Sequence, residues 1–219
     1  MLSAEERRQR LEAARVYLVI DAAAAPAVVP EALAGGVDLV QLREKNMTDA
    51  EILEAAREVL ALCEQHDALF ILNDRPDLAG MCGAHGVHVG QDDEPVESVR
   101  ATVGDEAIVG VSTHSPDQIE AAELSSADYF AVGPVWETPT KAGRPAVGLD
   151  LVEHAAARAP GKPWFAIGGI DASRAPEVVD AGARRIVVVR ALRDADDPRA
   201  AARALRETLE REPVGGQAQ

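Results

Sequence analysis

The chain has 219 residues, of which 47% are hydrophobic and 27% are charged, a composition that fits one globular domain and excludes wholesale disorder. Its formal net charge is −15, which excludes a protein that binds nucleic acid or acidic membranes through a general basic surface. A site for an anionic substrate must therefore gather its positive charge locally.

Residues 1–15 are charged and lack the apolar core of a signal peptide, so we expect an extra N-terminal helix and a cytoplasmic protein. No stretch approaches the roughly 20 apolar residues of a membrane span. The two cysteines, Cys63 and Cys82, fall in helix-like segments without a CxxC spacing, so they are expected to be buried thiols.

From residue 16 onward, short apolar runs alternate with longer, amphipathic, Ala-rich segments. Continuous apolar runs are typical of strands buried on both faces, as in a parallel sheet covered by helices. Capping-box patterns at Thr48 with Glu51 and at Ser115 with Gln118 indicate helix starts. The eight predicted strands are 17–20, 39–42, 69–72, 87–89, 108–111, 129–132, 164–167 and 186–189.

Eight β–α units without a break in composition predict an α/β protein with a single (β/α)8 TIM barrel. The barrel is expected over residues 16–211, after a helical extension over 1–15 and before a flexible tail over 212–219. An open, doubly wound sheet is the alternative, but neither GxGxxG nor GxxxxGK[ST] occurs where such a fold would need it.

In a TIM barrel the residues that follow the strands build the active site. After the second strand, Gln41, Arg43 and Lys45 alternate, so their side chains can point to one side. Arg43 would offer a planar fork to phosphate oxygens and Lys45 a point charge. The alternative is a charged strand edge with Glu44 as a surface partner. The chain has three lysines and 19 arginines, and two of the lysines, Lys45 and Lys141, fall in these loops, which favours a binding role.

Two aspartates follow neighbouring strands, Asp74 after the third and Asp93 after the fourth, so both carboxylates can face the same opening. Two carboxylates completed by water and phosphate oxygens are typical of a magnesium site. Helix N-capping is the alternative for each aspartate. The basic residues that converge from the second strand favour Mg2+.

The late loops predict a second anion-binding zone. Gly168 and Gly169 would let backbone amides approach a ligand, and residues 189–190 begin the final helical segment. A tight turn is the alternative for the two glycines. The loop after the sixth strand supplies two hydroxyls and an ammonium through Thr138, Pro139, Thr140 and Lys141. Two zones indicate two phosphorylated substrates. His88, Tyr129 and Trp136 are expected to be packing residues.

These segments, taken in order, resemble the thiamine-phosphate synthase family from Val16 to about Glu210. The matching segments are VQLREK (40–45), NDR (73–75), GVHVGQDD (86–93), GVSTHS (110–115), VGPVWETPTK (132–141), AIGGI (166–170) and VVRAL (188–192). The resemblance implies an enzyme, often oligomeric, that uses Mg2+ to couple 4-amino-2-methyl-5-hydroxymethylpyrimidine diphosphate with a thiazole monophosphate. A homo-oligomer that acts only on small molecules is therefore expected.

The resemblance also implies roles for individual residues. The pyrimidine diphosphate would contact Gln41, Leu42, Arg43, Glu44, Lys45, Asn73, Ser112 and Lys141. Arg43, Lys45, Ser112 and Lys141 would be catalytic, and Asp74 and Asp93 would hold Mg2+. The thiazole phosphate would contact Thr138, Pro139, Thr140, Gly169, Val189 and Arg190. Arg190 departs from the family, which often has serine there.

Two other functions are compatible with such a barrel. A thiazole tautomerase has little use for a second anion pocket, so the segment QLREK and the aspartate pair argue against it. A non-catalytic barrel that binds thiazole phosphate or thiamine phosphate as a sensor or carrier is the alternative from another class.

Overall fold

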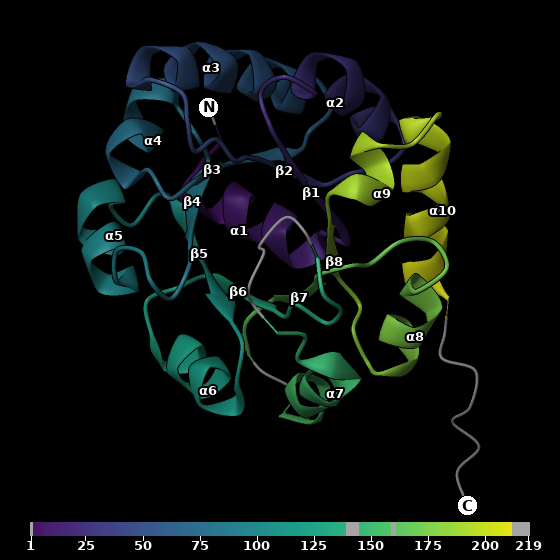
Figure 1. The fold of residues 1–219 in the computed structure, drawn as a ribbon. Helices are drawn as coiled ribbons and strands as arrows, with labels where there is room; N and C mark the ends of the chain where they lie inside the picture. The colour runs from purple at the N-terminus through teal and green to yellow at the C-terminus, as the bar shows by residue number, and fades with distance from the viewer. Residues whose placement is uncertain (1, 139–144, 159–160, 212–219) are drawn as a thin grey trace, which may run out of the picture.

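The computed structural model describes residues 2–138, 145–158 and 161–211. The strands pair in parallel in chain order, and β8 returns to β1, so the predicted (β/α)8 barrel is confirmed (Figure 1). The strands are β1 Val16–Ile20, β2 Leu39–Leu42, β3 Leu69–Asn73, β4 Gly86–Val89, β5 Ile108–Thr113, β6 Tyr129–Val132, β7 Trp164–Ile167 and β8 Ile186–Val188.

Two strands continue beyond their predicted C-terminal ends, and both extensions carry polar residues. β3 continues through Asn73, and β5 continues through Ser112 and Thr113, which pair with Ala131 and Val132 of β6. Parallel pairing with the neighbouring strand therefore holds polar residues at the strand ends in fixed positions, where we had expected them in loops.

Helices follow the strands and surround them. They are α1 Ala4–Ala13, α2 Ala25–Ala34, α3 Asp49–Gln65, α4 Pro76–Cys82, α5 Val96–Val103, α6 Pro116–Leu124, α7 Gly148–Arg158, α8 Ala175–Asp180, α9 Arg190–Arg193 and α10 Pro198–Glu210. The capping box at Thr48 and Glu51 is confirmed at the start of α3. At α6, Ser115 caps Gln118 N, but the Gln118 side chain accepts from His114 N instead. No helix among the described residues is long and apolar enough to cross a membrane.

Side chains alternate between two hydrophobic layers, as strand geometry requires. Outward residues pack against the helices, and the buried thiols Cys63 and Cys82 lie in that layer, as predicted. The inward residues fill the barrel, where Tyr17, Tyr129 and Phe165 are its largest side chains. The interior is thus a packed core with polar groups toward one end.

The predicted N-terminal helix, α1, closes the other end of the barrel and crosses the middle of the view in Figure 1. Its Leu11 is 2% exposed and packs with the interior residues. Arg7 donates to the carbonyl oxygens of His85 and Glu106, which precede β4 and β5. These are the N-terminal ends of the strands, so α1 leaves the C-terminal ends accessible.

Candidate active site

A cavity of about 340 Å3 lies at the C-terminal ends of the strands. Active sites of TIM barrels lie at this end of the strands, and each of the eight strands contributes lining residues, among them Tyr17 of β1, His88 of β4 and Val187 of β8. Of the predicted site residues, the cavity is lined by Gln41, Arg43, Asn73, Ser112, Thr138, Gly169, Val189 and Arg190. The two predicted zones therefore open into one space.

Strand alternation decides which residues of the QLREK segment reach the cavity. Gln41 and Arg43 point inward and line it, whereas the side chain of Leu42 packs against the helices and is 0% exposed. The predicted contact of Leu42 with the pyrimidine diphosphate would therefore have to come from its backbone. Glu44 turns back toward β1, where its carboxylate accepts from Ala22 N at 2.5 Å.

The two predicted metal ligands interact with each other beside a lysine. The Lys45 ammonium lies 3.8 Å from the Asp74 carboxylate. Burial raises the pKa of Asp74, and the negative charge of Asp93 and a hydrogen bond with its carboxyl raise it further. A buried carboxyl whose ionisation is disfavoured by a neighbouring carboxylate forms a place where a cation is stabilising.

Neither aspartate caps a helix, so that alternative is wrong. The N-cap of α4 is Arg75 and that of α5 is Pro95, and neither helix has a side-chain cap. Asp93 instead accepts from Gly90 N at 2.8 Å, within the turn after β4. Asp74 adopts a left-handed backbone with φ 57°, and its N–H donates to His88 O. These turns bring the two carboxyls into contact with each other.

The β7–β8 side of the cavity contains a turn of two glycines. Gly168 and Gly169 have φ of 106° and 69°, and a Cβ on Gly169 would lie 2.8 Å from Cβ of Trp136. Gly168 and Gly169 therefore form a tight turn, and the backbone of this turn is also the part that lines the cavity. Arg174 lies over the Trp136 ring at 4.9 Å and donates to Gly169 O at 2.9 Å.

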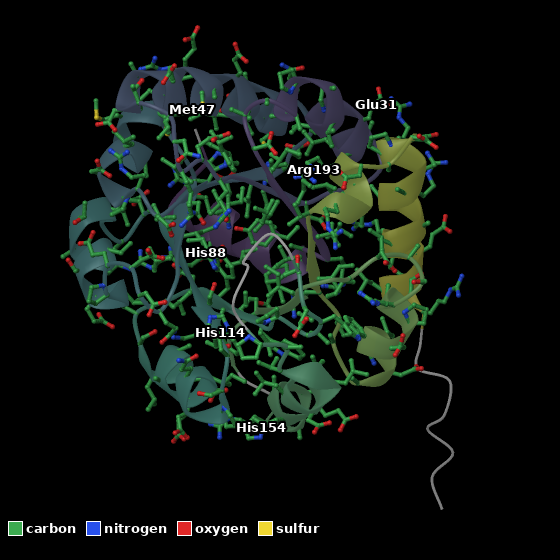
Figure 2. All side chains as sticks on the ribbon, in the orientation of Figure 1. Glu31, Met47, His88, His114, His154 and Arg193 are labelled. Atoms are coloured by element: carbon green, nitrogen blue, oxygen red, sulfur yellow. The ribbon has the colours of Figure 1, made fainter. Side chains whose placement is uncertain are left out.

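Several cavity residues were not predicted as site residues. Tyr17, His88 and Arg174 line the cavity, and Figure 2 shows His88 near the middle of the barrel. His88 was expected only to pack, yet its two ring nitrogens contact Tyr129 and Ser112, both at 3.0 Å. The available sequence signal was the position of His88 and Tyr17 in strands, in phase with inward-facing neighbours. Pro139, Thr140 and Lys141 lie outside the described residues.

The donor set for a metal is limited to the aspartate pair. Among residues 2–138, 145–158 and 161–211, no three His, Cys, Asp or Glu side chains cluster to bind a metal ion. Asp74 and Asp93 supply hard oxygen donors, and Mg2+ commonly takes its remaining ligands from water and phosphate. The chemistry of the pair therefore fits Mg2+ held jointly with a phosphorylated substrate.

Comparisons with known proteins identify the family of the chain. A family model described as thiamine monophosphate synthase matches residues 16–192. Thiamine-phosphate synthase of Mycolicibacterium smegmatis is 50% identical over 214 residues, covering 92% of this chain and 94% of that protein. Thiamine-phosphate synthase of Thermobifida fusca is 49% identical over 210 residues, covering 94% and 96%.

Solved structures give the same result. Thiamine phosphate pyrophosphorylase from Pyrococcus furiosus is 33% identical and superposes with a TM-score of 0.82, covering 93% of this chain and 97% of that one. A 3-hexulose-6-phosphate synthase, at 22% identity and a TM-score of 0.64, covers 89% of this chain and 99% of its own and shares the fold.

Proposed function

The chain belongs to the thiamine monophosphate synthase family, and we propose which side of its cavity binds each of two substrates. The enzyme is a transferase of thiamine biosynthesis that condenses a pyrimidine and a thiazole moiety. In our proposal, 4-amino-2-methyl-5-hydroxymethylpyrimidine diphosphate occupies the β2–β5 side, and a thiazole monophosphate occupies the β7–β8 side. The products are thiamine phosphate and diphosphate.

The observation that carries this proposal is the meeting of cations and carboxylates at one side of the mouth. Arg43 lines the cavity, Lys45 lies 3.8 Å from Asp74, and Asp74 interacts with Asp93. A diphosphate carries several negative charges and needs cations close to it in a chain whose net charge is −15. The grouping supplies such charge together with a metal-binding pair.

Asp74 and Asp93 would hold Mg2+, and Lys45, whose ammonium lies 3.8 Å from the Asp74 carboxylate, would contact the diphosphate. When bound, Mg2+ would neutralise charge that grows on the departing diphosphate. Removal of one carboxylate would weaken the site because each supplies ligands that water replaces poorly.

The reaction needs no protein nucleophile. The bond between the pyrimidine methylene carbon and the diphosphate oxygen breaks, leaving a cation that the aminopyrimidine ring stabilises. The thiazole nitrogen then donates its electron pair to this carbon, and the C–N bond of thiamine phosphate forms. Arg43, Lys45 and Lys141 would stabilise the leaving diphosphate, and Ser112 would hold the pyrimidine near it.

The thiazole phosphate would bind where the backbone comes close to the cavity. Gly169, Val189 and Arg190 line that side, and Thr138 lies at its edge. Backbone amides there would donate to phosphate oxygens, and the Arg190 guanidinium would add charge that a serine could not. Pro139 and Thr140 are proposed to complete this pocket. Location in the cytoplasm and assembly into a homo-oligomer also stay predictions.

Incubation of the purified protein with both precursors and Mg2+ tests the proposal. We expect diphosphate and thiamine phosphate to form in equal amounts. Isomerisation of a thiazole carboxylate without diphosphate release would indicate a tautomerase instead. Binding without turnover would indicate a sensor or carrier, and either result would overturn the proposal.

A matched pair of variants tests the diphosphate side of the cavity. Arg43→Met should lower kcat/KM by on the order of 10²–10³, because one charged contact to the leaving group is lost. Arg10→Met removes an arginine that pairs with Asp67 at the closed end, at 2.9 Å, and should leave kcat/KM unchanged. Equal kcat/KM values for the two variants would show that Arg43 does not contact the diphosphate.

A further inference from the structure

Five buried side chains form one hydrogen-bonded chain beneath the cavity. Gln41 Nε2 donates to Tyr17 Oη at 2.5 Å, and Tyr17 Oη lies 2.9 Å from Tyr129 Oη. Tyr129 Oη lies 3.0 Å from His88 Nδ1, and His88 Nε2 lies 3.0 Å from Ser112 Oγ. Gln41 and Ser112, at the two ends, both line the cavity, whereas Tyr129 in the middle does not.

Burial and aromatic packing hold these five side chains in place. None of its five members is more than 7% exposed. Tyr17 and Tyr129 each pack edge-to-face on Phe165, with ring centroids 5.5 Å and 5.6 Å apart. They are the only two tyrosines of the sequence. Burial raises the pKa of each phenol, so both hydroxyls keep their hydrogen near neutral pH.

A glycine makes room for the central tyrosine. A Cβ on Gly110 would lie 2.1 Å from Cζ of Tyr129 and 2.5 Å from its hydroxyl oxygen. Any other residue at position 110 would displace this ring. The position of the Tyr129 hydroxyl is therefore set by β5 as well as by its own strand.

The number of hydrogens on each of these five side chains determines which group donates and which accepts in each hydrogen bond. A phenol has one hydrogen, and within the described residues the Tyr17 hydroxyl contacts Gln41 Nε2, which donates to it, and Tyr129 Oη, so its buried hydrogen is satisfied by donation to Tyr129. Tyr129 must then donate to His88 Nδ1, which makes His88 the neutral tautomer with its hydrogen on Nε2. That N–H donates to Ser112 Oγ. Within the part of the chain that the structure describes, the amide oxygen of Gln41 and the hydroxyl hydrogen of Ser112 have no protein partner and are left for a ligand.

We propose that Tyr17 and Tyr129 are positioning residues that hold Gln41 as a hydrogen-bond acceptor and Ser112 as a donor toward the substrate. This inference rests on the proposed function, in which these two residues hold the pyrimidine. A 4-aminopyrimidine carries both an amino donor and ring-nitrogen acceptors, so it matches one acceptor and one donor. A 4-oxopyrimidine replaces the amino donor with an acceptor and mismatches the Gln41 oxygen.

The tautomer of His88 is the direct readout in the unliganded protein. Long-range 1H–15N correlation spectra, with His88 assigned by comparison with His88→Asn, should show a neutral ring protonated at Nε2. Tyr129→Phe removes the donor to Nδ1, so the Nε2–H tautomer should lose its dominance. A hydrogen on Nδ1 in the wild-type protein would overturn the proposal.

Substrate discrimination is the functional readout, with Tyr17→Phe, Tyr129→Phe and Thr113→Val compared. Thr113→Val removes a hydroxyl that is equally buried but bonds Ala131 O, outside the chain of contacts. Each tyrosine variant should lower kcat/KM for the aminopyrimidine diphosphate roughly 5- to 50-fold, the cost of one buried hydrogen bond. The preference over the 4-oxo analogue should shrink by a similar factor, whereas Thr113→Val should stay within about twofold.

The outcomes separate this inference from the proposed function. The 4-amino and 4-oxo compounds differ in intrinsic reactivity, but this difference is the same for every variant. It therefore cancels when the kcat/KM ratios of the variants are compared. Tyrosine variants that discriminate like Thr113→Val would overturn the positioning role. If the wild-type protein forms no thiamine phosphate, the proposed function fails, and the His88 spectra of wild type and Tyr17→Phe still decide the direction of the chain. Tyr17→Phe also serves if Tyr129→Phe does not fold.

Discussion

At the closed end of the barrel, aspartates are paired with arginines and backbone amides, whereas at the open end they face each other. Asp128, before β6, accepts from Arg8 at 2.9 Å, Arg100 at 2.5 Å and Val109 N at 2.8 Å. Asp38, before β2, is bound in the same way by Arg206 and by main-chain amides. These carboxylates complete the protein's own structure.

The open end uses the same residue type for a different purpose. Among the described residues, the one ion pair of Asp74 is with Lys45 at 3.8 Å, and burial, followed by the neighbouring charge of Asp93, raises the pKa of Asp74. Such an arrangement costs stability and persists where a ligand compensates for it. The two ends use the same residue type, so what distinguishes them is whether each aspartate is fully paired with arginines and backbone amides or faces another aspartate.

The largest expected effect tests the open end. Asp93→Asn should lower kcat/KM by on the order of 10²–10³, because it removes a proposed anionic ligand for Mg2+ while keeping side-chain shape. Its free energy of unfolding should not fall by more than about 1 kcal/mol, since a repulsive charge is removed as well. Steady-state kinetics and urea unfolding measure the two effects.

A neighbouring aspartate provides the control for Asp93. Asp92 is exposed in the same turn, and Asp92→Asn should keep activity within about twofold. Activity of Asp93→Asn that matches Asp92→Asn at ordinary Mg2+ levels would refute the metal assignment.

The next effect tests the closed end. Asp128→Ala should lower the free energy of unfolding by about 3–4 kcal/mol, because Arg100, 13% exposed, loses its partner and Val109 N loses its acceptor. Turnover by the folded fraction should be unchanged. Asp105→Ala, which removes an exposed carboxylate nearby, is the matched control for urea unfolding. A loss of kcat/KM in Asp128→Ala would show that the two ends are not separate.

A histidine at the closed end predicts acid sensitivity. Burial, and then the charge of Arg7, lowers the pKa of His85 to about 4, and its Nδ1 accepts from Phe70 N. Between about pH 6.5 and pH 4 the unfolded chain binds the extra proton, so stability falls as pH falls, by up to about 3 kcal/mol.

His85→Asn isolates this contribution, since asparagine keeps an acceptor near Nδ1 but does not titrate. The stability difference between wild type and His85→Asn should shrink as the pH is lowered from about 7 to about 5. His66→Asn, which changes an exposed histidine, is the control. A pH-independent difference between wild type and His85→Asn would contradict the prediction.

The smallest effect concerns α1. Ser3 Oγ accepts from Glu6 N at 3.3 Å, and the Glu6 carboxylate accepts from Ser3 N at 2.8 Å. Ser3→Ala should therefore cost about 1 kcal/mol of stability without a change in kcat/KM. A fall in activity at unchanged stability would mean that α1 influences the cavity.

The sequence predicted the architecture closely because barrel strands are buried on both faces and read as continuous apolar runs. All eight strands lie within two residues of their expected ends. It also indicated which loops carry the site, since the chain order of strands fixes the order of their C-terminal ends. Strand alternation was enough to place Gln41 and Arg43 on one face and Leu42 on the other.

Which side chains from different strands contact one another was decided by the tertiary structure. Periodicity orders residues within one strand, but the stagger of paired strands determines which residues of different strands lie at one level. That stagger brings Asp74 against Asp93 and links Tyr17, Tyr129 and His88. Sequence thus fixed the fold and the residue types at the mouth, while closure of the barrel determined which of them meet, because hydrogen bonds and charges act only over a few ångströms.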